Sequence, residues 1–557
     1  MARHGGAAPR NIAHEAPHRA DQLGMSSRLT LGWHDAGQPA SHRTHLDRYG
    51  PLPQHGTGRH GDLIDAVTQA GLTGRGGAGF PTGVKMRSVA SRRGQPVVVA
   101  NGMESEPASE KDKALLARAP HLVLDGAVLA AAAVGAGTVH VCLPRNRDWL
   151  IAIVADAVAE RERLGRDGYR FPVAIEVHGL PHHYVSSEET SVVHWLNGGE
   201  ARPTAVPPRP YEKGVGGRPT LLDNVETLAH VALIARFGPA WYRQAGLADA
   251  PGTMLATVSG AVDAPGVYEI EVGTPIGEVP GMSGAWPAAG PLLVGGYFGT
   301  WHGAEDVAGL PLAATTLRPV GAAPGAGVLV ALPPDACGLA ETARVLAWLA
   351  GQAAGQCGPC VFGLPAIADD FAQLASGRPQ GPVLDRLGRR LSTVIGRGAC
   401  RHPDGAVRLA RSALSAFAAD VKSHASRRVC LSARRVSSAA PCCPSLSRRI
   451  WRSGNEGPAM RHRMAVNPIA CTGHGICAEL LPELIGLDEW GYPILAERDV
   501  PPDLAALSRR AVRLCPTLAL RLEPANAERR VPAGGPQDPA RAGGRHGGGN
   551  GRRADPR

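Results

Sequence analysis

Regular hydrophobic patterning begins at about residue 61 of the chain. In residues 62–70, DLIDAVTQA, apolar side chains recur on one helical face, which favours an amphipathic helix. Short apolar runs then predict strands at 97–101, 138–143 and 171–179, and longer stretches predict helices at 114–137 and 148–164. This alternation of strands and helices predicts an α/β domain over residues 61–248.

The pattern changes after residue 248. Between 252 and 280, apolar residues alternate with polar ones, and Gly or Pro turns interrupt them. We therefore expect a small β-rich domain over residues 249–334. Two helical stretches, 339–376 and 383–421, predict a helical domain over residues 335–421. A compact unit with three cysteines follows at 464–523.

Three segments lack apolar periodicity. Residues 1–60 are rich in His and Gly, and we expect them to form a loose N-terminal arm. Residues 422–463 and 524–557 are rich in Ser, Gly, Pro and Arg, a composition typical of disordered segments. We interpret these two segments as a basic linker and a tail.

The charge of the chain is concentrated in that linker and that tail. The 557 residues carry 59 basic and 49 acidic side chains, for a net charge of +10, which at first suggests nucleic-acid binding. Residues 421–463, however, hold ten basic side chains and one acidic one, and residues 524–557 hold seven and three. Trp451 is the one aromatic residue among them, so we do not expect nucleic-acid binding.

The composition also indicates where the protein is located and what its cysteines do. No apolar run approaches the 18 residues of a membrane helix, and the N-terminus lacks the apolar core of a signal peptide. We therefore expect a cytoplasmic protein. Eleven cysteines in such a chain favour metal ligation over disulfides.

A glycine-rich segment follows the first predicted helix. Gly74, Arg75, Gly76, Gly77, Ala78 and Gly79 match the pattern G-x-G-x-x-G. The NAD-binding Rossmann motif requires a strand before this pattern, and the preceding residues are helical, so we reject that interpretation. Closely spaced glycines still let backbone N–H groups approach an anion, and Lys85 can pair with a phosphate. The alternative is a plain glycine-rich turn.

Three further motifs follow in order. Asn101-Gly102-Met103-Glu104-Ser105-Glu106 lies at a predicted strand end, where ligands bind in α/β sheets. Tyr184-Val185-Ser186-Ser187-Glu188-Glu189 places two carboxylates near a tyrosine, and Gly217-Arg218-Pro219-Thr220 leads to Asp223-Asn224-Val225-Glu226-Thr227. Residues 60–420 thus resemble the flavin- and NADH-binding subunit of respiratory complex I, the 51 kDa type, which also occurs in NAD-linked hydrogenases and formate dehydrogenases.

The resemblance implies a fold and a set of site residues. The fold would combine a Rossmann-like FMN-binding α/β domain, a β-grasp-like SLBB domain and a helical iron–sulfur domain. The loop from Gly74 to Gly79 and Lys85 would hold the FMN phosphate. The flavin would be lined by Asn101, Glu104, Glu106, Tyr184, Glu188, Asn224 and Thr227. Phe80 and Glu189 would lie on the nicotinamide dinucleotide side, and Glu104 and Glu189 would be the catalytic carboxylates.

The chain departs from the family pattern at several positions. Met103, Ser187 and Asp223 replace the usual Asp, Gly and Asn. Ser88 and Gly216 stand where the family has aromatic residues that stack on the adenine of NADH. FMN binding is therefore better supported than NADH binding, and the donor can be NADH, NADPH or another reduced carrier.

The first cysteine group is Cys357-Gly358-Pro359-Cys360, with Cys400 after 39 intervening residues. Thiolates at this spacing can bind one iron–sulfur cluster; a zinc site and a redox disulfide are the alternatives. The resemblance implies four cysteines around a [4Fe–4S] cluster, but Ala354 stands where the first belongs. A [3Fe–4S] cluster, or a cubane completed by water or by a side chain such as His402, would suit three thiolates.

The second group comprises Cys471, Cys477 and Cys515, and Pro516 follows the last. This module resembles the small single-cluster α+β ferredoxins, common in actinobacteria, that serve cytochromes P450. His474 occupies the middle slot of the motif, which is typical of a [3Fe–4S] cluster or of a [4Fe–4S] cluster with one ligand that is not cysteine. Cys471, Cys477 and Cys515 are the expected ligands.

Together these features predict a fused redox chain. NAD(P)H would be oxidised at FMN, and single electrons would pass through the cluster of the helical domain to the ferredoxin. The ferredoxin would deliver them to a redox partner protein such as a cytochrome P450 or a membrane reductase. The alternative is a non-catalytic carrier or scaffold subunit that keeps the fold but not NADH oxidation.

Overall fold

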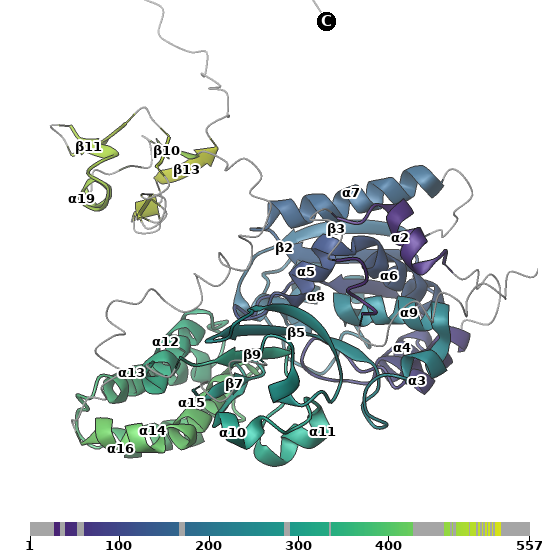
Figure 1. Cartoon of the computed structure of the whole chain (residues 1–557). Coiled ribbons are helices and arrows are strands. Elements are labelled where there is room, and N and C mark those ends of the chain that lie inside the picture. The colour runs from purple at the N-terminus through teal and green to yellow at the C-terminus, as the bar shows by residue number, and fades with distance from the viewer. Residues whose placement is uncertain are drawn as a thin grey trace, which may run out of the picture. The chain divides into compact units, whose positions relative to one another are not determined.

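The computed structural model describes residues 27–33, 39–52, 61–165, 173–282, 290–333 and 336–426 and, with gaps, residues 462–524 (Figure 1). The chain divides into two compact units, Met1–Asn455 and Glu456–Arg557. The predicted linker and tail lie almost wholly outside the described residues, so their predicted disorder stays a prediction.

A parallel sheet of four strands forms the centre of the α/β domain. The strands are β1 (Val97–Asn101), β2 (Thr138–Pro144), β3 (Ala174–Leu180) and β4 (Thr220–Asn224), and they lie in the order β3-β2-β1-β4. The chain passes from β1 outward to β2 and β3, and then returns to place β4 on the other side of β1. The strand order therefore reverses between β1 and β4, which is where open α/β sheets bind ligands.

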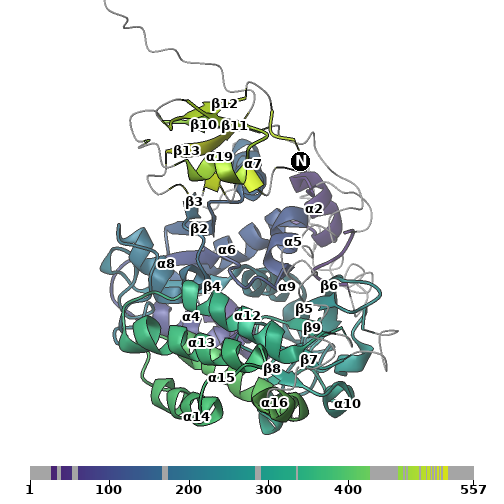
Figure 2. The ribbon, with the colours of Figure 1, turned by 90° about the vertical axis from the view of Figure 1, so that its left-hand side faces the viewer.

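Helices cover both faces of this sheet, because alternate strand residues point to opposite faces. One face packs against α3 (Gly61–Ala70), α4 (Thr82–Ala90), α5 (Lys111–Arg118), α6 (Pro120–Val134), α7 (Asp148–Gly165) and α9 (Val225–Tyr242). The other face packs against the short helix α8 (Glu189–Leu196), through Val99, Cys142 and Val192. Figure 2 shows α8 on one side of these strands and α5, α6 and α9 on the other.

The helix expected over residues 114–137 is two helices. Helices α5 and α6 meet at an angle of 96°, and the break falls at Ala119, whose φ of −136° and ψ of 52° are not helical. Pro120 causes the break, because a proline ring disfavours helical backbone in the residue before it. Among the described residues no single helix meets the length and hydropathy of a membrane span, and this bent pair meets them only jointly.

The expected loose arm is wrong for residues 27–33 and 39–52. Residues His42–Tyr49 form helix α2, which packs on the α/β domain. The Arg28 guanidinium is buried, donates to the carbonyl oxygens of Trp241 and Tyr242 at 3.2 and 2.9 Å, and lies 4.1 Å from the Trp241 ring centroid. The Leu29 N–H donates to the Glu269 carboxylate at 2.7 Å. Such long-range contacts leave no local pattern in the sequence.

A second, mixed sheet of five strands follows. Its order is β6-β5-β9-β7-β8, and its strands are β5 (Thr253–Gly260), β6 (Gly266–Glu271), β7 (Leu292–Val294), β8 (Thr300–His302) and β9 (Val328–Ala331). The short helices α10 (Ala304–Val307) and α11 (Ala314–Leu317) pack with it around their own apolar core. This region is thus rich in β-strands, as the sequence predicts.

Helices then form a bundle, which Figure 2 shows with its members packed side by side. They are α12 (Gly338–Gly351), α13 (Leu364–Ala375), α14 (Val383–Val394), α15 (His402–Ala416) and α16 (Ala418–Ala425). A π-helical turn, η6 (Pro359–Gly363), precedes α13. The bundle buries Leu346, Phe371 and Leu387 in one core.

The C-terminal unit has its own small core. Strand β10 (His462–Val466) pairs antiparallel with β13 (Leu520–Pro524), β11 (Ile485–Leu487) pairs antiparallel with β12 (Pro493–Leu495), and the helix α19 spans Ile476–Leu480. Met464, Leu481, Ile485 and Leu520 are buried together.

Candidate functional site

The strand order reverses between Asn101 and Asn224, which end β1 and β4 and lie opposite each other in the parallel register. The Asn101 side-chain amide donates to the carbonyl of Ser187 at 2.9 Å. The Asn224 side-chain oxygen accepts from the N–H of Glu226 at 3.0 Å and so caps α9. Both predicted asparagines are therefore brought together at the crevice where the fold favours a ligand.

The glycine-rich loop closes over this crevice. The N–H of Gly74 donates to the carbonyl of Phe80 at 2.8 Å, and Gly77 and Gly79 have positive φ values of 103° and 63°, which residues other than glycine rarely adopt. A Cβ on Gly76 would lie 3.5 Å from the Cβ of Asn224. The loop is exposed from Gly76 onward, so its backbone is accessible to an anion.

Arg75 anchors the base of the loop. Its N–H donates to Thr227 Oγ1 at 2.9 Å, and its guanidinium donates to Tyr242 Oη and the Thr253 carbonyl, both at 3.1 Å. The Arg75 side chain thus points into the protein, and the Thr227 hydroxyl is engaged with the loop backbone. Both residues shape the loop, and a direct contact of either side chain with a cofactor stays a prediction.

Lys85 lies among acceptors beside the crevice. Its Nζ is 2.5 Å from the carbonyl oxygen of Leu222, 3.4 Å from Asp223 Oδ1 and 3.7 Å from Glu189 Oε2. Burial raises the pKa of Asp223, and Lys85 counteracts that rise. The Asp223 Oδ2 atom is buried and has no hydrogen-bond partner among the described residues. Lys85 therefore balances Asp223, which stands where the resemblance implies an asparagine.

Glu104 is buried at the start of α5. Its carboxylate accepts hydrogen bonds from Ser109 Oγ at 2.5 Å and from the N–H groups of Asp112 and Lys113, both at 3.1 Å. These contacts make Glu104 a cap of α5, which positions the segment between β1 and that helix. Its catalytic role, predicted from the resemblance, stays a prediction.

Glu106 and Tyr184 form a buried pair. Tyr184 Oη donates to Glu106 Oε2 at 2.8 Å, and the N–H of Tyr297 donates to the same oxygen at 3.0 Å. Burial raises the pKa of Glu106 to about 7, although these hydrogen bonds act to lower it. A Cβ on Gly296 would lie 2.9 Å from Glu106 Cδ, so the second sheet approaches this carboxyl through a glycine.

This raised pKa predicts a pH dependence of stability. A carboxyl group with a pKa near 7 in the folded state and 4.5 in the unfolded state contributes stability that is complete below pH 4.5 and is lost as pH rises from there through 7. We expect the wild type to lose about 2–3 kcal/mol from this group between pH 5 and 8. Asp112, whose pKa burial raises to about 6, acts in the same direction.

The Glu106→Gln variant isolates the contribution of Glu106. Denaturant unfolding at several pH values should give a flatter stability profile for this variant than for the wild type. Two equally steep profiles would contradict the assignment.

The two adjacent glutamates differ in environment. Glu188 caps α8, because its carboxylate accepts from the N–H groups of Thr190 and Ser191 at 2.8 and 3.1 Å, and burial raises its pKa. The Glu189 side chain is 27% exposed and lies 3.7 Å from both Lys85 Nζ and Arg209 Nη1. Glu189 is therefore the glutamate of the pair that can face an external molecule.

An aromatic group connects Tyr184 to the helical bundle. Its ring is steeply inclined to those of Phe298, Trp348 and His402, with centroids 4.7, 5.3 and 5.6 Å away. Trp348 belongs to α12, and His402 begins α15, two residues after Cys400. Sequence reasoning missed Phe298 and Trp348 because they come from separate domains and no local motif marks them.

The first three predicted cysteines lie near one another. Cys357 precedes η6, Cys360 lies within it, and Cys400 precedes α15. Burial raises the pKa of Cys360 to about 12, and the neighbouring Cys357 and Cys400 contribute to that rise. Burial also raises the pKa of Cys400, and the charge of Glu188 adds to the rise. The Cys400 thiol is thus electrostatically coupled to a predicted flavin residue.

The donor set of this site has three thiols. Ala354 is 5% exposed and supplies no ligand. His402 is engaged elsewhere, since its Nε2 lies 2.8 Å from the carbonyl oxygen of Leu349, while its buried Nδ1 has no hydrogen-bond partner among the described residues. Three thiols coupled to each other fit an iron–sulfur cluster with one position not filled by cysteine.

The three cysteines of the C-terminal unit also come together. Burial raises the pKa of Cys477, and Cys471 and Cys515 raise it further. Cys477 and Cys515 pack against the small core around Leu481. His474 and Pro516 lie outside the described residues. The thiols therefore form a second candidate cluster site.

A polar cavity of about 480 Å³ lies at the end of α4. It is lined by Ser88, Ser91, Arg92, Arg93, Glu212, Gly217 and Pro219. Arg92 pairs with Glu212 at 3.1 Å. The cavity thus contains Ser88, one of the positions where the resemblance places an adenine-stacking aromatic residue, and Gly217, the neighbour of the other.

Three family models match the chain. The Nuo51 FMN-binding domain matches residues 67–233, the NADH-ubiquinone oxidoreductase-F iron-sulfur binding region matches residues 340–424, and a 4Fe-4S single cluster domain matches residues 465–522. Their order agrees with the order of the α/β domain, the helical bundle and the C-terminal unit.

Individual proteins resemble the chain over most of their own length. The F subunit of NADH-quinone oxidoreductase from Streptomyces coelicolor (strain ATCC BAA-471 / A3(2) / M145) is 30% identical over 377 residues, which are 66% of this chain and 84% of that protein. The F 2 subunit of NADH-quinone oxidoreductase from Rhizobium meliloti (strain 1021) is 29% identical over 378 residues, 66% of this chain and 90% of that protein. The crystal structure of an NAD+-reducing [NiFe]-hydrogenase in the H2-reduced state has a TM-score of 0.63 at 30% identity, covering 71% of this chain and 66% of the hydrogenase chain.

Proposed function

Because this chain belongs to the family of the F subunits of NADH-quinone oxidoreductase, we propose that it oxidises NADH or NADPH at FMN and delivers single electrons to its C-terminal ferredoxin. The chain is an oxidoreductase of the NADH dehydrogenase type, with an FMN-binding domain and two iron–sulfur domains. We propose three further points: which donor is used, which residues form the site, and how electrons travel beyond the helical domain.

The proposal rests mainly on the crevice at the ends of β1 and β4. Asn101 and Asn224 meet in register there, and the exposed glycines of the loop lie over them. This arrangement fits a ligand with a phosphate and a flat ring system, because backbone N–H groups suit the phosphate and the glycines leave room for the ring. FMN supplies the ability to accept two electrons as hydride and release them one at a time.

The chain's own residues would orient the two reactants. The loop from Gly74 to Gly79 would hold the phosphate, and Arg75 fixes that loop through Tyr242 and Thr253. Glu189, which is partly exposed beside Lys85, would orient the nicotinamide carboxamide or ribose. The cavity with Arg92 and Arg93 would receive the adenosine end of the donor, where two guanidinium groups also suit the additional phosphate of NADPH.

The route out of the crevice would begin at the cysteines of the helical bundle. The Tyr184 ring contacts that of His402, two residues after Cys400, and the charge of Glu188 acts on the Cys400 thiol, so the flavin segment would lie near the cluster ligands. Cys471, Cys477 and Cys515 would hold the second cluster. Residues 464–523 carry eight acidic and five basic side chains, which suits docking to a basic partner such as a cytochrome P450 or a membrane reductase.

One experiment tests the proposal against the carrier alternative, which Ser88 and Gly216 favour. The protein is purified anaerobically, its flavin and iron–sulfur absorbance is recorded, and NADH or NADPH is added. Rapid bleaching with either nucleotide is expected. Bound flavin that does not bleach would instead support a non-catalytic carrier, and absence of flavin would contradict both functions.

A further inference from the structure

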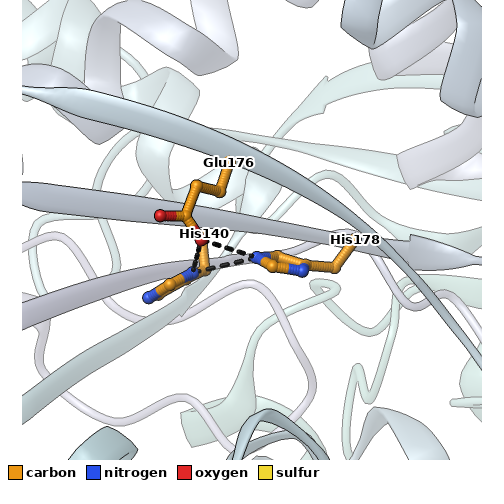
Figure 3. Close-up of side chains that lie close together, drawn as sticks. All are labelled: His140, Glu176 and His178. Atoms are coloured by element: carbon orange, nitrogen blue, oxygen red, sulfur yellow. Dashed lines mark hydrogen bonds and ion pairs between the residues drawn. The ribbon is translucent and has the colours of Figure 1, made fainter. Parts of the chain in front are cut away.

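A cluster of two histidines and one glutamate lies on β2 and β3, on the side of β1 away from β4. The register of β2 and β3 places His140 opposite Glu176, and the two-residue period of a strand places His178 on the same face as Glu176. This is the face that α8 covers, and the His178 ring lies 6.1 Å from the Trp195 ring on that helix. Figure 3 shows the three side chains converging.

The three potential ligand atoms are close together. His140 Nδ1 is 2.9 Å from His178 Nε2 and 3.3 Å from Glu176 Oε2, and His178 Nε2 is 3.5 Å from the same carboxylate oxygen. Atoms at these separations lie on a circle of about 1.9 Å radius. An ion at about 2.0–2.1 Å from each atom, as Zn²⁺ requires, would sit just off the plane of the three.

The two imidazoles are arranged for ligation. Two ring nitrogens face each other at 2.9 Å, and neutral imidazole nitrogens are common metal ligands. The other ring nitrogen of His140, Nε2, is buried and has no hydrogen-bond partner among the described residues. The Glu176 side chain is 53% exposed, so an ion can reach the site from solvent.

We propose that His140, Glu176 and His178 bind one divalent transition-metal ion, with Zn²⁺ the best match and water completing the coordination. Two imidazoles and one carboxylate are the donors that borderline ions prefer, whereas Mg²⁺ and Ca²⁺ prefer oxygen ligands. The charge of Arg218 acts on His140 and opposes a cation there, so the affinity is expected to be moderate. The site is independent of the flavin crevice.

The ion would tie the edge strand β3 to β2. Strand β3 ends at Leu180, and Tyr184 follows four residues later. The bound ion would therefore fix the position of the strand that leads to Tyr184. Binding to the folded state alone stabilises it by mass action. The proposal therefore predicts a rise of the unfolding temperature with Zn²⁺.

The test compares zinc content and thermal stability of the full-length, cluster-loaded protein. Wild type, Glu176→Gln and His178→Gln are equilibrated with zinc sulfate, freed of excess ion on a desalting column and analysed for zinc and iron by mass spectrometry. His194→Gln is the matched control, because His194 lies on the neighbouring helix α8 outside the cluster. Zinc bound by cysteines is common to all four proteins.

We expect the wild type and the control to hold one zinc equivalent more than Glu176→Gln and His178→Gln, at equal iron. Zinc should also raise the unfolding temperature of the first two proteins by several degrees and leave that of the other two unchanged. The Glu176 side chain is half-exposed, so its replacement should not disturb folding. Equal zinc content and equal thermal shifts in wild type and Glu176→Gln would overturn the proposal.

Discussion

Replacing Cys400 by alanine is expected to abolish the iron–sulfur cluster of the helical bundle while reduction of the flavin by the nicotinamide donor continues. Three thiols converge at this site and Ala354 adds no fourth, so the variant would retain only Cys357 and Cys360. A cluster that already lacks one cysteine ligand is not expected to survive the loss of a second. The iron content should fall by one cluster, and the ferredoxin should no longer be reduced by the donor.

Cys337→Ala provides the matched control for this prediction. Cys337 is buried in the same bundle at the start of α12 but lies outside the three-thiol group. Its replacement should leave the iron content and the electron paramagnetic resonance signal of the reduced protein unchanged. Retention of the full signal by Cys400→Ala would show that Cys400 is not a ligand.

Replacing Lys111 by methionine is expected to lower the free energy of unfolding by about 3–5 kcal/mol, because it leaves buried carboxylates without their counter-ion. Lys111 Nζ lies 2.6 Å from Asp112 Oδ1 and 2.8 Å from Glu226 Oε2, and all three side chains are buried. Burial acts to lower the pKa of Lys111, but the two acids outweigh it and raise that pKa above its ordinary value. Lys111 also donates to Asn224 Oδ1 at 3.3 Å, and the Asn224 amide donates to Asp112 at 2.6 Å, so loss of flavin is expected too.

Arg87→Met is the control for the loss of a cation. Arg87 pairs with Asp65 at 2.7 Å, but both side chains are more than half exposed. Surface pairs contribute about 0–1 kcal/mol, so this variant should unfold almost like the wild type in denaturant titrations. A cost for Lys111→Met as small as that for Arg87→Met would contradict the role of the buried ion cluster.

The sequence predicted those parts of the site that depend on local pattern. Asn101 follows a β-branched run, and the structure places it at the end of β1. The rejection of a Rossmann motif at Gly74 is confirmed, since helix α3 and not a strand precedes the loop. Both conclusions rest on the order of strand, helix and turn signals, which a sequence displays directly.

Features that depend on tertiary contact were not predictable in this way. The ring contacts of Tyr184 join residues from three separate parts of the chain, and no spacing rule relates them. The role of Glu104 as a helix cap follows from three donors that meet only after folding. Pro120, in contrast, was a visible signal, and the break between α5 and α6 was missed because the apolar run on both sides is continuous.

The contacts of Arg28 and Leu29 have a consequence for where this protein can be divided. Arg28 binds carbonyls at the end of α9, while the next residue binds Glu269 of the second sheet. This segment therefore connects α9 to the second sheet. It lies more than thirty residues before the region that matches the flavin-domain model, 67–233. The folded unit thus extends beyond the region that the flavin-domain model matches, and a fragment that begins at residue 67 would lack the contacts that join α9 to the second sheet.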